Sequence, residues 1–532
     1  YTWINNGTVT ADVAGQTLNL QPPGNGGQPI QNNGTLSATG GGRLLLSASV
    51  VGSPTSQVTA GAGSVVEMNG VTISGTLNTT GSGSFRTTNV QSNALSGVAL
   101  NGTVDLASQP SQLRITDGLA LNGTINVGSG SQLYIDNRST PTQSITGTGT
   151  IAMAGAALRV EGAGQTTLGS GVTIAGSGSL GTAIITSGAH QLINNGTIVA
   201  NRNGETLNIQ PIANGSLAIQ NNGTMGASNG GQLTLTTGVN GGAGSRIDVD
   251  AASRVIVNSA VLSGVVNQTG TGAIEFTNNF ANGLAGSTLS GRVSLTGGGQ
   301  ARISDGMTMN AGSTITVGSG SALIFDNRTT PAQTVGGSGQ IVMAGGAMRF
   351  EGGTSTTLGS GVTITGNGSM GQALSVAANQ TLVNNATIVA QGGTLSIGPI
   401  ANSGGIQGTG TLRADGGTLN LGTNQPTSQG TLDIRATGSV ALGAQNITLS
   451  NDYTNAQSGT GNAFDRRAAV TGTGQILAGG NAAQAITGAN VTNGGTTNAT
   501  LTIGNVRVGT TTFDYQVANT GTTGPTLRGA IQ

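Results

Sequence analysis

The sequence of 532 residues contains no cysteine and no lysine, and only 7% of its residues are charged. The absence of cysteine excludes disulfides, thiolate nucleophiles and cysteine-ligated metals. The absence of lysine excludes Schiff-base chemistry and lysine–asparagine crosslinks within this chain. The 18 basic residues, all arginine, balance 18 acidic ones. A nucleic-acid binder needs a basic excess to neutralise phosphates, so we expect no nucleic-acid partner.

Aromatic residues are also scarce, at 2%, although hydrophobic residues of all kinds reach 35% and glycines number 96. The apolar residues are mostly Val, Ile, Leu and Ala, set among Thr, Ser and Asn. This composition is typical of narrow strands with tight turns between them. No apolar run reaches the roughly 18 residues of a membrane span, and no signal peptide is recognisable. The sequence opens in the middle of a repeat pattern, so we expect targeting signals to lie outside this chain.

Long internal repeats organise the chain. The segment INNGTVTADVAGQTLNLQP at 4–22 recurs as INNGTIVANRNGETLNIQP at 193–211, and more loosely as VNNATIVAQGGTLSIGP at 383–399. The longest match pairs 115–181 with 303–371. Because every offset lies near 190 residues, the chain contains two long blocks and the beginning of a third. The expected organisation is a first block at 1–189, a second at 190–379, a partial third block with a cap at 380–490, and a different, Ig-like segment at 491–532.

A shorter period runs inside each block. Units that read turn and then alternating strand recur at roughly 18–29 residues, the length of one coil of a parallel β-helix. In Gly102–Leu106 the alternation points Val104 and Leu106 inward and Thr103 and Asp105 outward. We therefore predict an all-β fold, a parallel β-solenoid, in which the equivalent leucines 18, 207 and 395 are buried. An array of β-sandwiches is the rival, but no regular period of about 100 residues is present.

The C-terminal segment GNVRVGTTTFDYQVANTGTTGPTLRGAIQ at 504–532 resembles the start of the choice-of-anchor D domain. That domain is an Ig-like module of large exported bacterial proteins, and its opening hairpin is expected at 501–508 and 511–518. The INNGT coils resemble the β-strand-repeat proteins that carry this domain and, more broadly, filamentous-haemagglutinin-like and autotransporter passengers. The resemblance implies display at the bacterial cell surface, adhesion or matrix structure, and transfers no catalytic residue.

Three groups of polar residues are candidate sites. His190 is the single histidine; with no second metal ligand or nucleophile beside it in sequence, we interpret it as a solvated corner residue. Asp248 and Asp250 lie on one face of a strand and could bind calcium or flank a glycosidic bond, or simply pair with the nearby Arg246 and Arg254. Calcium-binding nonapeptide arrays are absent from the sequence.

The third group occurs in both long blocks. Its members in the first block are repeated in the second. We expect them either to contact a ligand in each block, or to close turns or form arginine–carboxylate ladders between coils. The pairs are Asp117 with Asp305, Asp136 with Asp326, Arg138 with Arg328, Arg159 with Arg349, and Glu161 with Glu351. We predict no catalytic, cofactor-binding or metal-binding residue in this group.

These observations together predict a non-enzymatic, extracellular structural or adhesive protein. Its expected partners are surface glycans or other matrix components, and the ends of the solenoid allow end-to-end self-association or mark truncation of a longer polypeptide. One alternative is a polysaccharide-binding or polysaccharide-degrading β-helix. However, this sequence lacks the Gly-His-Gly segment and the lysine that such enzymes use. A phage-type tail fibre is the other alternative.

Overall fold

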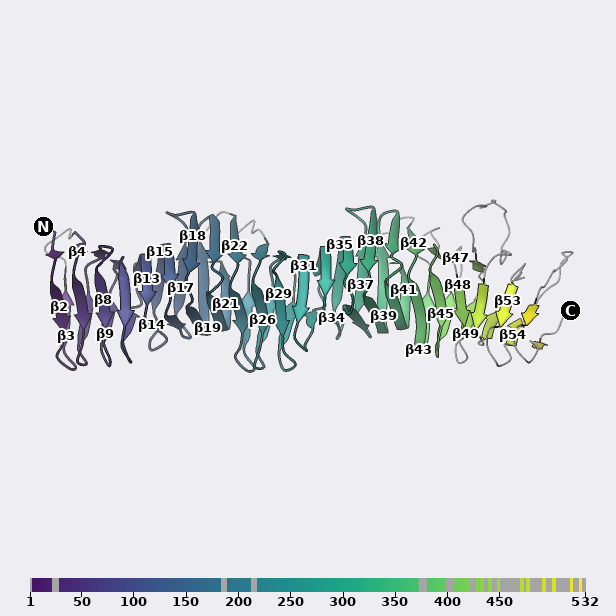
Figure 1. Ribbon diagram of the computed structural model, residues 1–532, viewed down its shortest axis with the longest axis horizontal. Helices are drawn as coiled ribbons and strands as arrows, with labels where there is room; N and C mark the ends of the chain where they lie inside the picture. The colour runs from purple at the N-terminus through teal and green to yellow at the C-terminus, as the bar shows by residue number, and fades with distance from the viewer. Residues whose placement is uncertain are drawn as a thin grey trace. The chain divides into compact units, whose positions relative to one another are not determined.

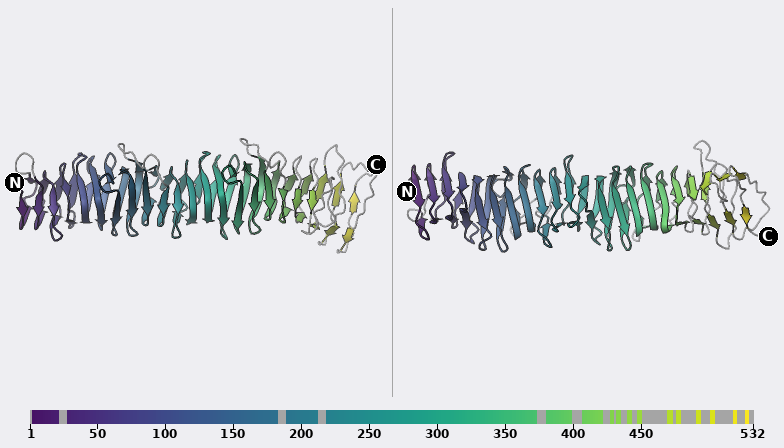
Figure 2. Two further views of the ribbon diagram at one scale, coloured as in Figure 1. Left: turned by 90° about the horizontal axis from the view of Figure 1, so that it is seen from above. Right: turned by 60° about the horizontal axis from the view of Figure 1, so that its bottom comes forward.

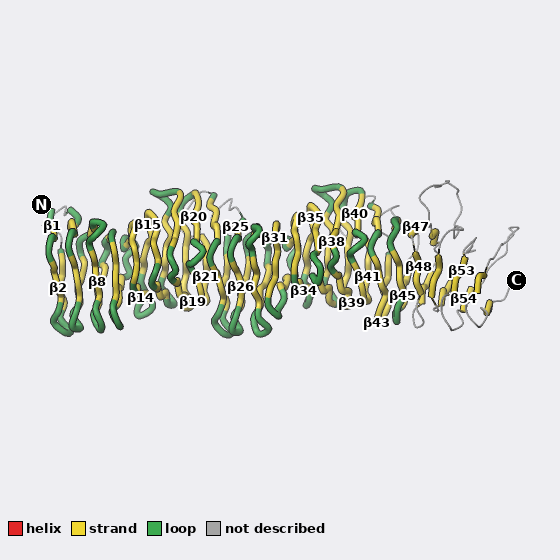
Figure 3. The backbone as a smooth tube through the Cα atoms, in the orientation of Figure 1, coloured by secondary structure: helices red, strands yellow, loops and turns green. Residues whose placement is uncertain are grey.

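The computed structural model describes residues 2–21, 28–182, 189–211, 218–372, 380–398 and 406–421, and beyond these only short separate strands. Every regular element within the described residues is a β-strand (Figure 3). The strands pair in parallel and form a β-solenoid of about 17 turns, so the fold predicted from the sequence is confirmed. Among the described residues, no helix is long and apolar enough to cross a membrane.

The chain divides into two units: residues 1–260 with 268–272, and residues 261–267 with 273–532. In the first unit, each turn contributes strands to three ladders, as the first two turns illustrate (Figures 1 and 2). The strands β1 (Ile4–Asn5), β2 (Thr8–Ala11) and β3 (Thr17–Leu20) pair with β4 (Ile30–Asn32), β5 (Thr35–Ala38) and β6 (Arg43–Leu46), respectively. The block boundaries expected from the repeats stay predictions.

The strands that carry the sites described below belong to both units. In the first unit they are β13 (Ala94–Asn101), β15 (Gln112–Leu121), β17 (Gln132–Asp136), β18 (Thr142–Thr146), β19 (Thr150–Glu161), β20 (Gly164–Leu168), β21 (Thr173–Thr182) and β22 (His190–Asn194). In the second unit they are β35 (Gln300–Met309), β37 (Ala322–Asp326), β38 (Ala332–Gly337), β39 (Gln340–Glu351), β40 (Ser355–Leu358) and β41 (Thr363–Gln372).

Alternating side chains build the core, because successive residues of a strand point to opposite faces. In β14 (Thr103–Leu106), Val104 and Leu106 are buried while Thr103 and Asp105 are partly exposed, as predicted. Of the three leucines expected to be buried, Leu207 and Leu395 are fully enclosed. The prediction is wrong for Leu18, which is 37% exposed. Leu18 lies in the first described turn, and within the chain only Leu44 of the next turn packs over it in register.

Glycine allows neighbouring turns to approach closely where long strands bend. In β21, Gly176 has φ +128°, and a Cβ there would lie 1.9 Å from the carbonyl oxygen of Met153 on β19. In the second unit, Gly366 has φ +118°, and a Cβ would lie 2.0 Å from the carbonyl oxygen of Met343. No other residue fits this backbone conformation and this spacing. The two blocks therefore share the same bend, built in the same way.

Asparagine side chains connect the turns from inside. The Asn5 amide donates to Oδ1 of Asn32 at 2.7 Å, 27 residues later, and Asn32 is fully buried. The repeat places the same contact between Asn194 and Asn221, also at 2.7 Å. A buried amide must find partners for its polar atoms, and the equivalent amide one turn away supplies one. The first asparagines of successive NNG motifs therefore hydrogen-bond to each other and connect neighbouring turns.

The segment 491–532, expected to begin an Ig-like domain, lies mostly outside the described residues. So do the greater parts of the expected hairpin strands 501–508 and 511–518. Two strands described there are β54 (Thr500–Ile503) and β56 (Thr526–Arg528), which pair in parallel with each other.

Candidate functional site

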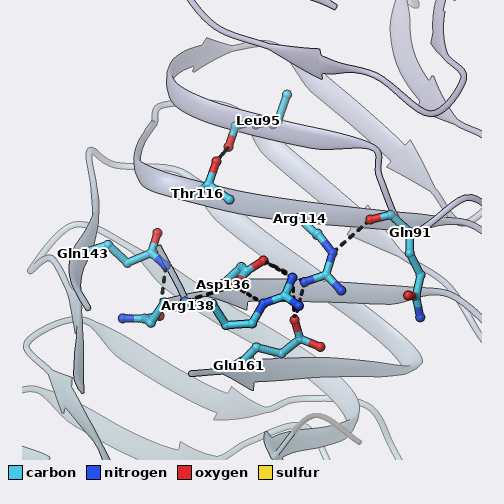
Figure 4. A network of polar contacts seen from close by, with 9 residues as sticks. Gln91, Leu95, Arg114, Thr116, Asp136, Arg138, Gln143 and Glu161 are labelled. Carbon is cyan, nitrogen blue, oxygen red and sulfur yellow. Dashed lines mark hydrogen bonds and ion pairs between the residues drawn. The ribbon is translucent and has the colours of Figure 1, made fainter. Parts of the chain in front are cut away.

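The first unit contains a cluster of four charged side chains, three of them buried, on β15, β17, β19 and the loop after β17 (Figure 4). The parallel register sets Asp136 beside Glu161 and Arg114 beside Tyr134. Arg114 lies on the same outward face as Asp136, and its long side chain spans the offset along the strands. The side chains of Arg114, Asp136 and Glu161 are 9%, 7% and 1% exposed. Two arginines and two carboxylates are thus held in one place.

The four groups are joined by charge-assisted hydrogen bonds. Nη1 of Arg114 donates to Oδ2 of Asp136 at 2.8 Å and also to Oε2 of Glu161. Arg138 approaches Asp136 with two donors, Nε to Oδ1 at 2.8 Å and Nη2 to Oδ2 at 2.6 Å. Its Nη2 lies 3.3 Å from Glu161. This planar, two-pronged geometry is the strong form of an arginine–carboxylate contact.

The pKa of the Asp136 carboxyl follows from these contacts. Burial alone would raise it, but the hydrogen bonds from the Arg138 side chain and backbone, with the charges of Arg138 and Arg114, outweigh burial and lower the pKa below its usual value. The hydrogen bond to Asp136 in turn raises the pKa of Arg138. Asp136 and Arg138 are therefore both charged at neutral pH. The cluster contains two arginines and two carboxylates, so it has no excess of either kind of group.

The second unit repeats the cluster with Arg302, Asp326, Arg328 and Glu351. Nη1 of Arg302 donates to Asp326 at 2.9 Å and also contacts Glu351. Arg328 again approaches Asp326 with Nε at 2.8 Å and Nη2 at 2.6 Å. Burial alone would raise the pKa of Asp326, but the hydrogen bonds from Arg328 outweigh burial, so the pKa is lowered overall. The ion pairs join successive turns in both units, which is the ladder interpretation of the repeated residues.

Sequence reasoning missed the arginine at the centre of each cluster. Arg114 and Arg302 occur in the related segments QLRITDG and QARISDG, directly before the longest repeat match. Extending that match by one residue would have found them. The repeated Asp117 and Asp305 lie elsewhere: each has a positive φ of 59° and accepts a hydrogen bond from a threonine of the next turn. Hydrogen bonds from Ser96 and Thr140 lower the pKa of Asp117.

A second buried polar network lies beside each cluster. In the first unit, Asn137 donates to the carbonyls of Pro141 and Gln165, both at 3.0 Å, and its Oδ1 accepts from Gln143 at 2.9 Å. Asn137 is 1% exposed. Thr166 also donates to Asn137, at 3.2 Å. The loop that contains Arg138 is therefore fixed to the turns on which it lies.

The expectation that His190 is a solvated corner residue is wrong. His190 begins β22 and is 1% exposed. Nδ1 lies 3.2 Å from the carbonyl of Gly162 and Nε2 lies 3.1 Å from Oγ1 of Thr166. Burial lowers its pKa, and the bond to Gly162 opposes this only in part. The histidine was misplaced because the parallel register with β20, which encloses it, cannot be read from local sequence.

Asp248 and Asp250 have different hydrogen-bond partners in the structure. Asp248 is on β29 (Arg246–Val249) and accepts a hydrogen bond from Thr269 at 3.0 Å. Asp250 follows the strand and accepts from the backbone amides of Asn229 at 2.8 Å and Ala252 at 3.1 Å. Bonds from the Ser253 side chain and from these amides lower its pKa. Asp250 therefore closes a turn through backbone hydrogen bonds.

Within the described residues, no three histidine or carboxylate side chains are grouped so that they could hold a metal ion. Two grooves lie on the second unit: one of about 380 Å³ near Asp305, Thr330 and Gln333, and one of about 420 Å³ beside Arg302 and Arg349.

No family model matches this sequence, and the search of curated proteins gave no match either.

Proposed function

We propose that this chain is a non-enzymatic, extracellular structural or adhesive protein. The observation that supports the proposal best is that closely spaced carboxylates of the chain are paired with arginines. Asp136 and Glu161, the two carboxylates of the cluster in the first unit, are both bound to Arg114 and Arg138. A hydrolytic pair needs one carboxyl that is protonated at neutral pH and a second that is free to react. Here the lowered pKa of Asp136 favours the charged, paired form.

Side-chain ladders on the outer surface also support a structural role. Asn101 donates to Asn78 at 3.0 Å, and Asn122 donates to Asn101 at 3.0 Å, so one exposed row of amides crosses three turns. Backbone ladders join the same turns. Neutral, regularly spaced amides and hydroxyls of this kind suit hydrogen bonding to hydroxyl-rich partners such as glycans. A polysaccharide-binding role belongs to the same proposal, and a polysaccharide-degrading role is its competitor.

The experiment measures adhesion and hydrolysis on the same material. Beads coated with the full chain are tested for attachment to surfaces bearing neutral or acidic polysaccharides, with beads carrying heat-denatured chain as the control. The same polysaccharides are incubated with soluble chain, and new reducing ends are measured. We expect attachment that depends on the folded chain and no release of reducing ends. Release that is abolished by Glu161→Gln would overturn the proposal in favour of an enzyme.

A further inference from the structure

The groove of about 420 Å³ on the second unit is formed by the order of side chains on three adjacent strands. On the outward face, Ala322 of β37 faces Ala347 of β39, and Ala347 faces Ser369 of β41. Two residues further along the same strands, Ile324 faces Arg349. A row of small side chains thus lies beside a row of larger ones, and residues of both rows line the groove. Its volume lies in the range of ligand sites, about 300–1,000 Å³.

Buried polar atoms in this groove lack partners. Ser321 is 2% exposed, and its Oγ has no hydrogen-bond partner; Oε1 of Gln300 is also unpartnered. In the first unit, the equivalent Ser131 donates to the carbonyl of Leu106 at 2.5 Å and to that of Gln109 at 3.2 Å. The loop containing Gln109 is one residue longer than its glycine-rich counterpart before Gln300. Buried polar groups are nearly always satisfied, so the unpartnered serine oxygen favours a hydrogen-bonding ligand in this groove.

The charge of the groove is positive. Arg302 and Arg328 are paired with Asp326 and Glu351. Arg349 also lines the groove, and no hydrogen bond or ion pair ties it to the part of the chain that the structure describes. Three arginines thus face two carboxylates. A free guanidinium presents donors in a fork that matches a carboxylate.

An exposed aromatic ring completes the site. Phe280 lines the groove and is 64% exposed, with the Arg302 guanidinium carbon 5.7 Å from its ring centroid. In the first unit this position is Gln91, and the aromatic residue is instead Tyr134, which is 4% exposed and lies over Arg114 at 4.6 Å. The two blocks therefore share the charge cluster but differ in what lies beside it. Among the described residues of these two blocks, the second has an exposed ring next to an unpaired arginine, whereas the ring in the first is buried.

We propose that this groove binds a short acidic glycan containing a carboxylated sugar. Arg349 binds the carboxylate through its two-pronged donors. Ser321 and Gln300 hydrogen-bond to sugar hydroxyls, and the apolar face of the sugar ring packs on Phe280. The positive excess favours an acidic sugar over a neutral one. This inference deepens the proposed adhesive function and rests on it, by naming the site and the class of glycan.

The test is titration calorimetry of the full chain with digalacturonate, a disaccharide of carboxylated sugars. The variants are Arg349→Ala and Phe280→Ala, and the matched control is Arg159→Ala at the equivalent position of the first block. We expect one site per chain, at least tenfold weaker binding in both groove variants, and unchanged binding in the control. Neutral digalactose should bind at least tenfold more weakly than digalacturonate. Unchanged thermal unfolding of Phe280→Ala, whose ring is exposed, shows that the loss is not misfolding.

Failure of the site and failure of the proposed function give different results. If wild-type beads adhere to acidic polysaccharide and Arg349→Ala beads adhere equally well, the groove is not the binding site, although the adhesive function stands. If digalacturonate binds as expected but the beads do not adhere, the site stands and the adhesive function fails. Absence of saturable digalacturonate binding, or binding that neither variant weakens, overturns the inference.

Discussion

Replacing Arg114 with methionine tests how much the buried charge cluster contributes to stability. Methionine keeps the apolar stem of the side chain but removes the guanidinium. Asp136 and Glu161, 7% and 1% exposed, then have only Arg138, whose side chain is 49% exposed. Removing one partner of a buried ion pair costs about 3–5 kcal/mol, because the remaining charge stays buried without compensation. We expect a loss of that size for Arg114→Met at neutral pH.

The control is Arg138→Met in the same cluster. The Arg138 side chain is 49% exposed, so solvent offsets part of its loss, and Arg138→Met should cost less than Arg114→Met. A second variant, Arg114→Met with Glu161→Gln, should recover part of the loss, because one uncompensated charge is removed. In the second unit Arg302 is 16% exposed, so Arg302→Met should have an effect of the same kind but smaller.

The assay combines urea unfolding with hydrogen exchange of the peptides that cover β15, β17 and β19, since repeat proteins open locally. The pKa of Asp136 is lowered in the folded chain, so its stabilising contribution is present above the unfolded value of about 3.9 and is lost as pH falls through the folded value. The difference between wild type and Arg114→Met should therefore shrink below about pH 4. Equal losses for Arg114→Met and Arg138→Met, or no recovery in the double variant, would refute the reasoning.

Three further predictions concern single buried positions. His190 has a lowered pKa in the folded chain. Its neutral form therefore stabilises the fold above the pKa of about 6.5 of the unfolded chain, and this stabilisation is lost as the pH falls below that value. In His190→Gln, which copies the equivalent Gln380, the melting temperature should vary less between pH 7 and 5. Asn221→Ala leaves the Asn194 amide with one fewer partner and should cost about 1–3 kcal/mol, measured by urea unfolding, whereas a loss below about 0.5 kcal/mol would contradict the ladder. Gly176→Ala should lower the stability by more than about 1–3 kcal/mol, because the residue has a positive φ and the added Cβ would clash with the neighbouring carbonyl. Gly7→Ala, with open space around it, should be nearly neutral. Similar melting temperatures for the two variants would contradict the close approach at Gly176.

Several features of the structure were predictable because they depend on short-range periodicity. Alternation of period two places Val104 and Leu106 in the core whichever strands lie beside them. The repeat of about 190 residues identifies Asp136, Arg138, Asp326 and Arg328 as duplicated positions before any contact is known. The parallel solenoid follows from these two signals together, since identical short units cannot bury their apolar edges alone.

The sequence alone therefore determined the all-β parallel solenoid, the inward face of its strands and the duplication of its polar residues. The tertiary structure decided which residues from different turns meet. The register with β20 encloses His190, whereas Leu18, which pairs in register with Leu44 of the next turn, is 37% exposed. Stacking also sets Arg114 between Asp136 and Glu161, 22 and 47 residues away. These contacts depend on the length of each turn, which varies along the chain, so only the assembled ladder fixes which charges pair and where a groove forms.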